Sequence, residues 1–234
     1  MIRKLILLLI FLPLTTSAQW VGDIRVASGK VKSWVASDLI EYQGVYHFGS
    51  SESESDLRVV IAGDKICIQR VYGEFTGDGQ GNVDYVKVYE NMLPVVMEGH
   101  KIQAGRYRGR FVKVEDERLE EKRGLLIEDT WSGNLDGGAE IGLYTVDLMT
   151  MYEGRFPRAS IEILVKDELE DYNKGELRIM RNEVFARYGY IFRSGGEMEA
   201  YFRRQDWYEG QHRNVDLFLT EIEKKNIKTI LSVE

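Results

Sequence analysis

The residues that could bind a ligand are polar or aromatic, and all of them follow residue 180: Arg181, Asn182, Arg187, Trp207 and Tyr208. A guanidinium at position 181 or 187 can grip a carboxylate through two parallel hydrogen bonds. Trp207 and Tyr208 can stack on a sugar or a peptide, as aromatic side chains do in many ligand clefts. One interpretation of this part of the chain is therefore a ligand-binding cleft.

The same residues also have a structural interpretation. Glu183 and Arg187 are four residues apart, in the order that favours an ion pair along a helix. Asn182 could bond a loop carbonyl, and Arg187 could hold the acidic or carbonyl end of another helix. Loss of stability in an Arg187→Ala variant would support this interpretation, whereas unchanged stability with lost binding would support the cleft.

A change of hydrophobic period positions these residues on helices. From Gly175 onward apolar residues recur about every 3.6 positions, which predicts an amphipathic helix. A second short helix is expected over 197–203. Thr220 and Glu223 form a capping box that starts a third helix. Residues 175–234 are therefore predicted to form a small three-helix module.

One stretch of this module resembles a known family. The run 177–192 is similar to the signature of the YARHG domain, which is named for a Tyr-Ala-Arg-His-Gly motif and appears here as Phe185-Ala186-Arg187-Tyr188-Gly189. Downstream residues match in the same order: Tyr201-Phe202, Trp207-Tyr208, and Leu219-Thr220 to Asn226-Ile227. The resemblance implies an extracytoplasmic bacterial module that is joined to varied partner domains and has no defined biochemical role. Tyr188 stands where the motif has its histidine, so a catalytic histidine is not implied here.

Known catalytic and metal-binding patterns are missing from the sequence. It has neither a Gly-x-Ser-x-Gly nor a His-Glu-x-x-His pattern, and of its three histidines, His47 is expected in a strand and His100 and His212 in exposed polar turns. The loop from Thr76 to Asp84 places oxygen side chains at alternate positions but lacks the Gly and Glu of a calcium-binding loop. We therefore predict no metal and no cofactor. A carboxylate pair for glycan hydrolysis stays possible because acidic residues are abundant.

The part before this module reads as antiparallel β-structure. Short apolar segments are separated by turn residues, with no room for helical crossovers between them. A tight turn is expected at Gly63, and a short helix at 37–42. The predicted fold class is α+β, with an N-terminal barrel or sandwich that is loosely similar to lipocalin-like barrels. The expected strands are 44–48, 57–61, 65–71, 83–89, 105–114, 125–127, 141–147 and 159–165.

Charge divides the chain at the same place as the hydrophobic period. The formal net charge is −7 for all 234 residues, +1 over 174–234 and −10 over 19–173. An acidic chain of this kind argues against a nucleic-acid partner. We expect an antiparallel β-domain over 19–165, a linker over 166–174 and the helical module over 175–234.

The first 18 residues have the features of a signal peptide. Arg3 and Lys4 precede an apolar run from Leu5 to Leu12, and small residues lead up to Ala18. The run is too short to span a membrane comfortably, so we expect cleavage after Ala18 and export without a membrane span in the mature chain. The single cysteine, Cys67, alternates with apolar residues in a predicted strand and is expected to be buried.

These observations lead to an exported protein of the bacterial envelope, periplasmic or extracellular, that binds a ligand or a partner without catalysis. Its expected partners are a cell-envelope glycan, a peptide or an envelope protein. The alternatives are a hydrolase that acts on envelope polymers through acidic residues of the β-domain, and a structural protein of the envelope.

Overall fold

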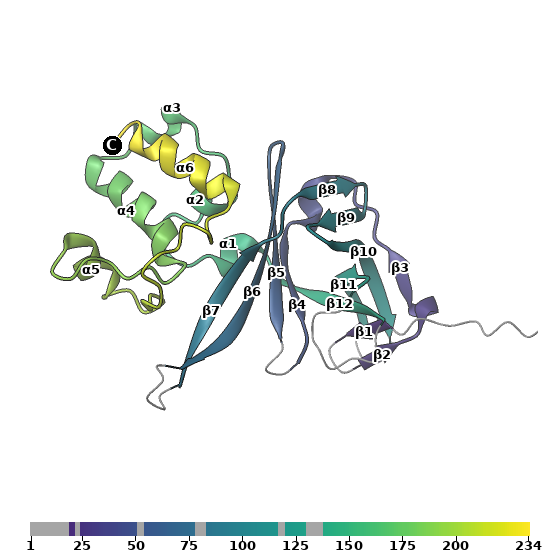
Figure 1. The fold of residues 1–234 in the computed structure, drawn as a ribbon. Coiled ribbons are helices and arrows are strands. Elements are labelled where there is room, and N and C mark those ends of the chain that lie inside the picture. Colours follow the sequence, from purple (N-terminus) through teal and green to yellow (C-terminus); the bar gives the residue numbers. More distant parts are fainter. Residues whose placement is uncertain (1–18, 22–23, 51–53, 78–82, 117–119, 130–137) are drawn as a thin grey trace, which may run out of the picture.

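The computed structural model describes residues 19–21, 24–50, 54–77, 83–116, 120–129 and 138–234 (Figure 1). Strands come first: β1 Gln19–Val21, β2 Ile24–Val26, β3 Val31–Ser33, β4 Gly44–Phe48, β5 Ser55–Ala62, β6 Lys65–Gly77, β7 Val83–Asn91, β8 Val95–Glu98, β9 Lys101–Ala104, β10 Tyr107–Asp116, β11 Glu120–Ile127 and β12 Ala139–Val146. Helices follow: α1 Leu148–Met151, α2 Arg158–Ile161, α3 Lys166–Leu169, α4 Lys174–Ala186, α5 Glu197–Phe202 and α6 Glu221–Leu231. Two short 3-10 helices lie among the strands, η1 Ser28–Lys30 and η2 Leu39–Tyr42.

All the strands belong to one sheet, with the order β7-β6-β5-β4-β12-β11-β10-β9-β8. The strands of this path pair antiparallel, while the short β1 joins β12 in parallel and β3 joins β10. β7 and β8 form the two ends, and no strand pairing among the described residues connects them. The sheet is therefore open. Of the two predicted forms, barrel or sandwich, the closed barrel is wrong.

The loop between α5 and α6 contacts the outer edge of β7. The backbone N–H of Lys87 in β7 donates to Gln211 Oε1 at 3.1 Å, and the Lys87 carbonyl lies 2.8 Å from His212 Nε2. Both groups point away from β6. At this position the outer edge of β7 is thus hydrogen-bonded to the helical region and not to another strand.

The inner face of the bent sheet is filled with aromatic side chains. Tyr42 stacks on Phe111 with their ring centroids 4.1 Å apart, and Trp34, Tyr46 and Phe48 are buried around them. The Tyr42 and Tyr46 hydroxyls donate to the carbonyls of Trp34 and Tyr42, at 2.9 and 2.7 Å. Their polar atoms are satisfied, so this core can be apolar elsewhere.

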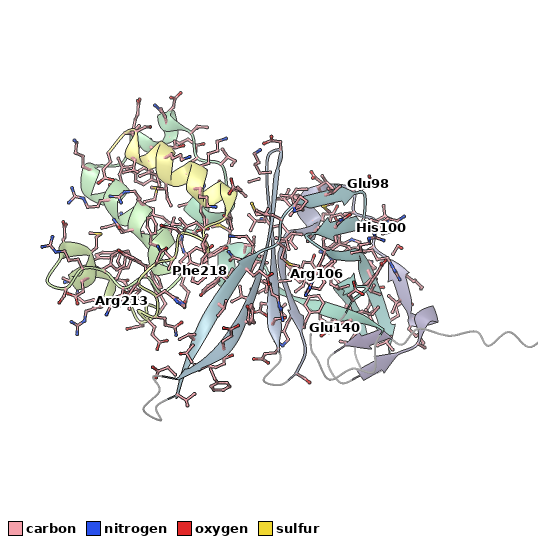
Figure 2. All side chains as sticks on the ribbon, viewed as in Figure 1. Glu98, His100, Arg106, Glu140, Arg213 and Phe218 are labelled. Carbon is pink, nitrogen blue, oxygen red and sulfur yellow. The ribbon has the colours of Figure 1, made fainter. Side chains whose placement is uncertain are left out.

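The helical region packs on the outer face of β4 to β7 (Figure 1). Val71 and Tyr89 from the sheet share one apolar cluster with α4, and Val60 and Cys67 share another with Ile222 of α6. Figure 2 shows Phe218 at this contact, between β6–β7 and the helices. Capping boxes begin α4 at Asn173 and α6 at Thr220, the second as the sequence predicts.

Most predicted strands are present, with small shifts at their ends. The turn at Gly63 joins β5 to β6, and the predicted helix at 37–42 is the 3-10 helix η2, which Asp38 caps. An antiparallel N-terminal sheet followed by a helical region is thus confirmed. The strands β1, β2, β3, β8 and β9 were not predicted, because three or four residues give too short a pattern to recognise.

The predicted strand over 159–165 is wrong, because this segment begins as the helix α2 and continues without a strand partner. Its backbone is satisfied by one distant side chain. The Asn226 amide donates to the carbonyls of Ala159 and Glu162, at 2.9 and 2.6 Å, and its oxygen accepts from Leu164 N at 2.9 Å. The apolar residues of the segment therefore pack against α4, α6 and the outer face of the sheet without adding a strand to it.

Candidate functional site

Arg187 lies at the C-terminal end of α4, in a buried ion pair with Glu183. Its Nε donates to the carbonyl of Glu153 at 2.9 Å, and one terminal nitrogen donates to Ser160 Oγ at 3.0 Å. Burial lowers the pKa of Arg187, and the adjacent Glu183 carboxylate opposes that shift. The ion pair predicted from the spacing is confirmed, and Arg187 does hold a carbonyl of a neighbouring segment.

Glu183 is bound from a second direction as well. Its two oxygens accept the backbone N–H groups of Arg155 and Phe156, at 2.9 and 2.6 Å. The pair therefore fixes the chain that enters α2 against the end of α4. A carboxylate with two backbone donors and a guanidinium is satisfied although it is buried.

Tyr188, which stands at the histidine position of the motif, connects α6 with the sheet. Its hydroxyl lies 2.6 Å from Glu223 Oε2 and accepts a bond from Gln69 Nε2 of β6 at 3.2 Å. Thr220 donates to the same oxygen of Glu223 through its backbone N–H, at 2.9 Å. Burial raises the pKa of Glu223 and that of Tyr188.

An arginine of the sheet completes this buried cluster. The Arg58 guanidinium of β5 lies 5.4 Å from the ring centroid of Tyr89 and 5.3 Å from that of Tyr152, which are cation–π distances. Asn91 of β7 donates to three successive carbonyls of the segment before α6, at 3.0 to 3.1 Å. We call Arg58, Gln69, Tyr188, Arg187 and Glu223 the interface cluster. It joins the helical region to the sheet.

Arg181 and Asn182 lie on a different face of α4, at an open groove. The groove has a volume of about 300 Å³, and its walls also include Phe185, Tyr190, Arg213, Asn214, Val215 and Asp216. Arg181 forms an ion pair with Glu234, with Nε 2.9 Å from Oε2, and this contact lowers the pKa of Glu234. Arg213 is exposed and has no ion-pair partner among the described residues.

Asn182 bonds its own helix and not a loop. Its amide donates to the carbonyl of Arg178 at 2.8 Å, so the expected contact with a loop carbonyl is wrong. An asparagine inside a helix often bonds the carbonyl four residues earlier in this way. Its side chain still lines the groove beside Arg181.

Trp207 and Tyr208 pack among aromatic side chains next to α5. Phe202 is fully buried, with Trp207 and Tyr208 at centroid distances of 6.0 and 5.7 Å. The Tyr208 hydroxyl donates to the carbonyl of Tyr190 at 2.6 Å. Neither side chain is among the residues that line the groove on α4.

The structure therefore divides the five predicted site residues into three places. Arg181 and Asn182 meet at the groove, Arg187 lies in the interface cluster, and Trp207 and Tyr208 lie in the aromatic cluster of α5. Sequence reasoning missed Arg213, because it lies in a loop without a pattern. It also missed Arg58 and Gln69, although polar residues inside otherwise apolar strands are a usable signal for a contact.

The sequence also drew attention to Cys67, to the histidines and to two polar loops. Cys67 is a free, buried thiol, and burial raises its pKa. The His212 ring is hydrogen-bonded to the carbonyl of Lys87 in β7. The loops at 76–84 and 131–140 lie partly, and the segment 1–18 wholly, outside the described residues. Within the described part of the chain, no group of three or more His, Cys, Asp or Glu could hold a metal ion.

Fold and site together define a two-part α+β protein in which a helical region with a buried Arg–Glu pair is docked on an open sheet. Residues 156–234 match the family model of the YARHG domain, so the C-terminal part of this chain is a YARHG domain. Searches among curated proteins and among solved structures gave no match. No helix among the described residues is both long and apolar enough to cross a membrane.

Proposed function

We propose that this protein is a non-catalytic binding protein of the bacterial cell envelope, and that the groove on α4 holds a ligand with a carboxylate. One observation carries the proposal. Arg181 and Arg213 line the same open groove, with Asn182 and Asn214 as further amide donors and a single carboxylate, Asp216. A groove in which donors outnumber acceptors suits an anion, and guanidinium groups suit carboxylates best.

The walls of the groove favour an organic acid over a small inorganic ion. Phe185 and Tyr190 are aromatic and line the groove beside the donors. Ligand sites commonly combine apolar walls with a few placed polar groups. Arg181 already shares its charge with Glu234, so Arg213 is the residue with more to contribute. The partner classes we propose are an envelope glycan with acidic groups, a peptide, or an envelope protein with an acidic segment, without nucleic acid, cofactor or metal.

The place of action is part of the same proposal. A basic start, an apolar run and small residues up to Ala18 support export of a chain that begins at Gln19. The expected location is the periplasm or the medium. Mass spectrometry of the protein recovered from each cell fraction checks this directly. An intact N-terminus at Met1 in the cytoplasmic fraction would refute it.

The groove is tested with a defined acidic probe. We expect muramyl dipeptide, an acidic glycopeptide, to bind the purified protein in isothermal titration calorimetry, and its amidated, uncharged analogue to bind much less. Arg213→Ala should weaken binding about tenfold or more, because a hydrogen bond to a charged group contributes about 1.5–3 kcal/mol. Arg204→Ala is the matched control, since Arg204 is also exposed but does not line the groove. Equal affinity of the wild type and Arg213→Ala would refute the site.

A hydrolase that acts on envelope polymers is the second candidate, and one arrangement favours it. On the outer face of the sheet His47 Nδ1 lies 2.9 Å from Asp56 Oδ1, and Glu54 Oε2 is 3.8 Å from the other ring nitrogen. An imidazole between two carboxylates can act as a general base. Cleavage of peptidoglycan fragments that Asp56→Asn abolishes would establish this activity, whereas intact fragments after long incubation would leave the binding function.

A further inference from the structure

A second groove lies on the outer face of the sheet, beside the part that the helical region covers. It holds about 110 Å³ and is lined by His47, Glu54, Ser55, Asp56, Val71, Tyr72, Gly73, Tyr85 and Lys87. These residues come from β4, β5, β6 and β7 and from the turn before β5. The groove shares no lining residue with the one on α4, so a ligand here does not depend on that site.

Tyr85 forms an aromatic platform in this groove. A Cβ atom on Gly73 would overlap Cζ of Tyr85, so the phenol ring of β7 lies directly over the glycine of β6. Tyr85 is nevertheless 50% exposed, and Phe75 at 63% lies beside it with a centroid distance of 5.1 Å. Of all the described aromatic side chains, only these two are that exposed. A ring that rests on a sheet and faces water is a surface on which an apolar face can stack.

The polar groups around the platform carry both signs of charge. His47 lies between two carboxylates, 2.9 Å from Asp56 Oδ1 and 3.8 Å from Glu54 Oε2, and Lys87 supplies an ammonium. A cationic ligand would be repelled by Lys87 and an anionic ligand by Glu54. A neutral ligand with hydroxyl groups can use both, because a hydroxyl donates to a carboxylate and accepts from an ammonium.

From this combination we infer that the groove binds a neutral saccharide. One sugar ring lies with its C–H face on Tyr85, and its hydroxyls bond Glu54, Asp56 and Lys87. The open shape of the groove leaves room for a chain of sugars to continue along the sheet face past Phe75. In Figure 1 the β6–β7 hairpin extends away from the helices.

The experiment uses the full mature chain and three soluble probes: cellotriose, triacetylchitotriose and maltotriose. Binding is followed by isothermal titration calorimetry and by saturation-transfer NMR. We expect at least one neutral trisaccharide to bind, and Tyr85→Ala to weaken it about five- to tenfold, since loss of an aromatic contact changes affinity by about that factor. Tyr85→Phe keeps the ring and should keep most of the binding.

Two further variants test whether binding needs the position of the Tyr85 ring and not merely an intact fold. Gly73→Ala keeps Glu54, Asp56 and Lys87 but displaces the ring of Tyr85, so it should weaken binding as Tyr85→Ala does. Asp64→Asn, at the exposed turn between β5 and β6, lies outside the groove, so it is the control and should change nothing. Circular dichroism of each variant checks that the sheet is retained.

Three outcomes would overturn the inference. The first is that no neutral trisaccharide binds. The second is that binding survives in folded Tyr85→Ala and Gly73→Ala protein. The third is that a lysine-rich peptide or trigalacturonic acid binds in competition with the neutral sugars and more tightly, which would mean that the groove selects a charge.

Discussion

Replacement of Arg187 by methionine tests whether the motif arginine is structural. Methionine fills much of the volume of arginine but removes the charge and the three hydrogen bonds that the guanidinium donates, so Glu183 loses its ion partner while still buried. Breaking a buried pair in this way costs about 3–5 kcal/mol. Glu183 keeps its bonds from Arg155 and Phe156, which places the expected loss near the lower end, at about 3 kcal/mol. For a chain of this size about 3 kcal/mol corresponds to a fall of about 6–12 °C in Tm.

Urea unfolding and thermal melts, followed by circular dichroism, measure this loss. The matched control is Arg204→Ala, which removes one exposed positive charge from the same domain and should change stability by less than about 0.5 kcal/mol. The double variant Glu183→Gln with Arg187→Met removes both charges, so it should be more stable than the sum of the two single losses predicts. Affinity for muramyl dipeptide should not change, because Arg187 does not line the groove on α4. A loss below about 0.5 kcal/mol for Arg187→Met would refute the structural role.

Three other predictions concern buried positions. Burial raises the pKa of Glu223, so the contribution of Glu223 to stability is favourable below its unfolded pKa and is lost as pH rises through the folded pKa. The unfolding free energy of the wild type minus that of Glu223→Gln, measured in urea between about pH 4 and about pH 8, should therefore fall as pH rises. A difference that does not change with pH would contradict this. Gly189 has a φ of +66°, and a Cβ there would lie 2.8 Å from the carbonyl oxygen of Glu209, so Gly189→Ala should cost about 2 kcal/mol in the same assay, with an unchanged midpoint as the contrary result. The Cys67 thiol is buried and its pKa is raised by burial, so a thiol reagent should label it at least about 100-fold more slowly in the native protein than in urea, and equal rates would show that it is accessible.

The fold could be predicted where the pattern is local. The strand β4 has the predicted bounds, and the turn at Gly63 joins two strands as expected, because alternation and turn residues act over a few positions. The segment 159–165 could not be predicted. Its apolar residues are equally suited to a strand, and the choice is made by Asn226, which is more than sixty residues away in sequence. The contact of Lys87 in β7 with the 211–212 segment also joins residues that are far apart in sequence.

The candidate site could be predicted only in part, because some of its contacts join residues that are far apart in the sequence. The pairing of Glu183 with Arg187 follows from four-residue spacing on a helix. That the pair is buried does not follow from spacing, since it needs the chain at 153–160 to cover it. Arg213 reaches the groove from a loop, and no periodic signal marks such a position. Arg181 and Arg187 are six residues apart, which places them on different faces of α4, and they belong to different sites.

Tyr188 shows how the module is adapted to the sheet. A phenol stays neutral and keeps its donor at any physiological pH, and burial raises its pKa further. An imidazole beside the buried carboxylate of Glu223 would be drawn into protonation and would add a second titrating group to the interface. The tyrosine hydroxyl instead donates to Glu223 and accepts from Gln69 of β6 without a change of charge. In this chain the motif position therefore serves the contact between helices and sheet.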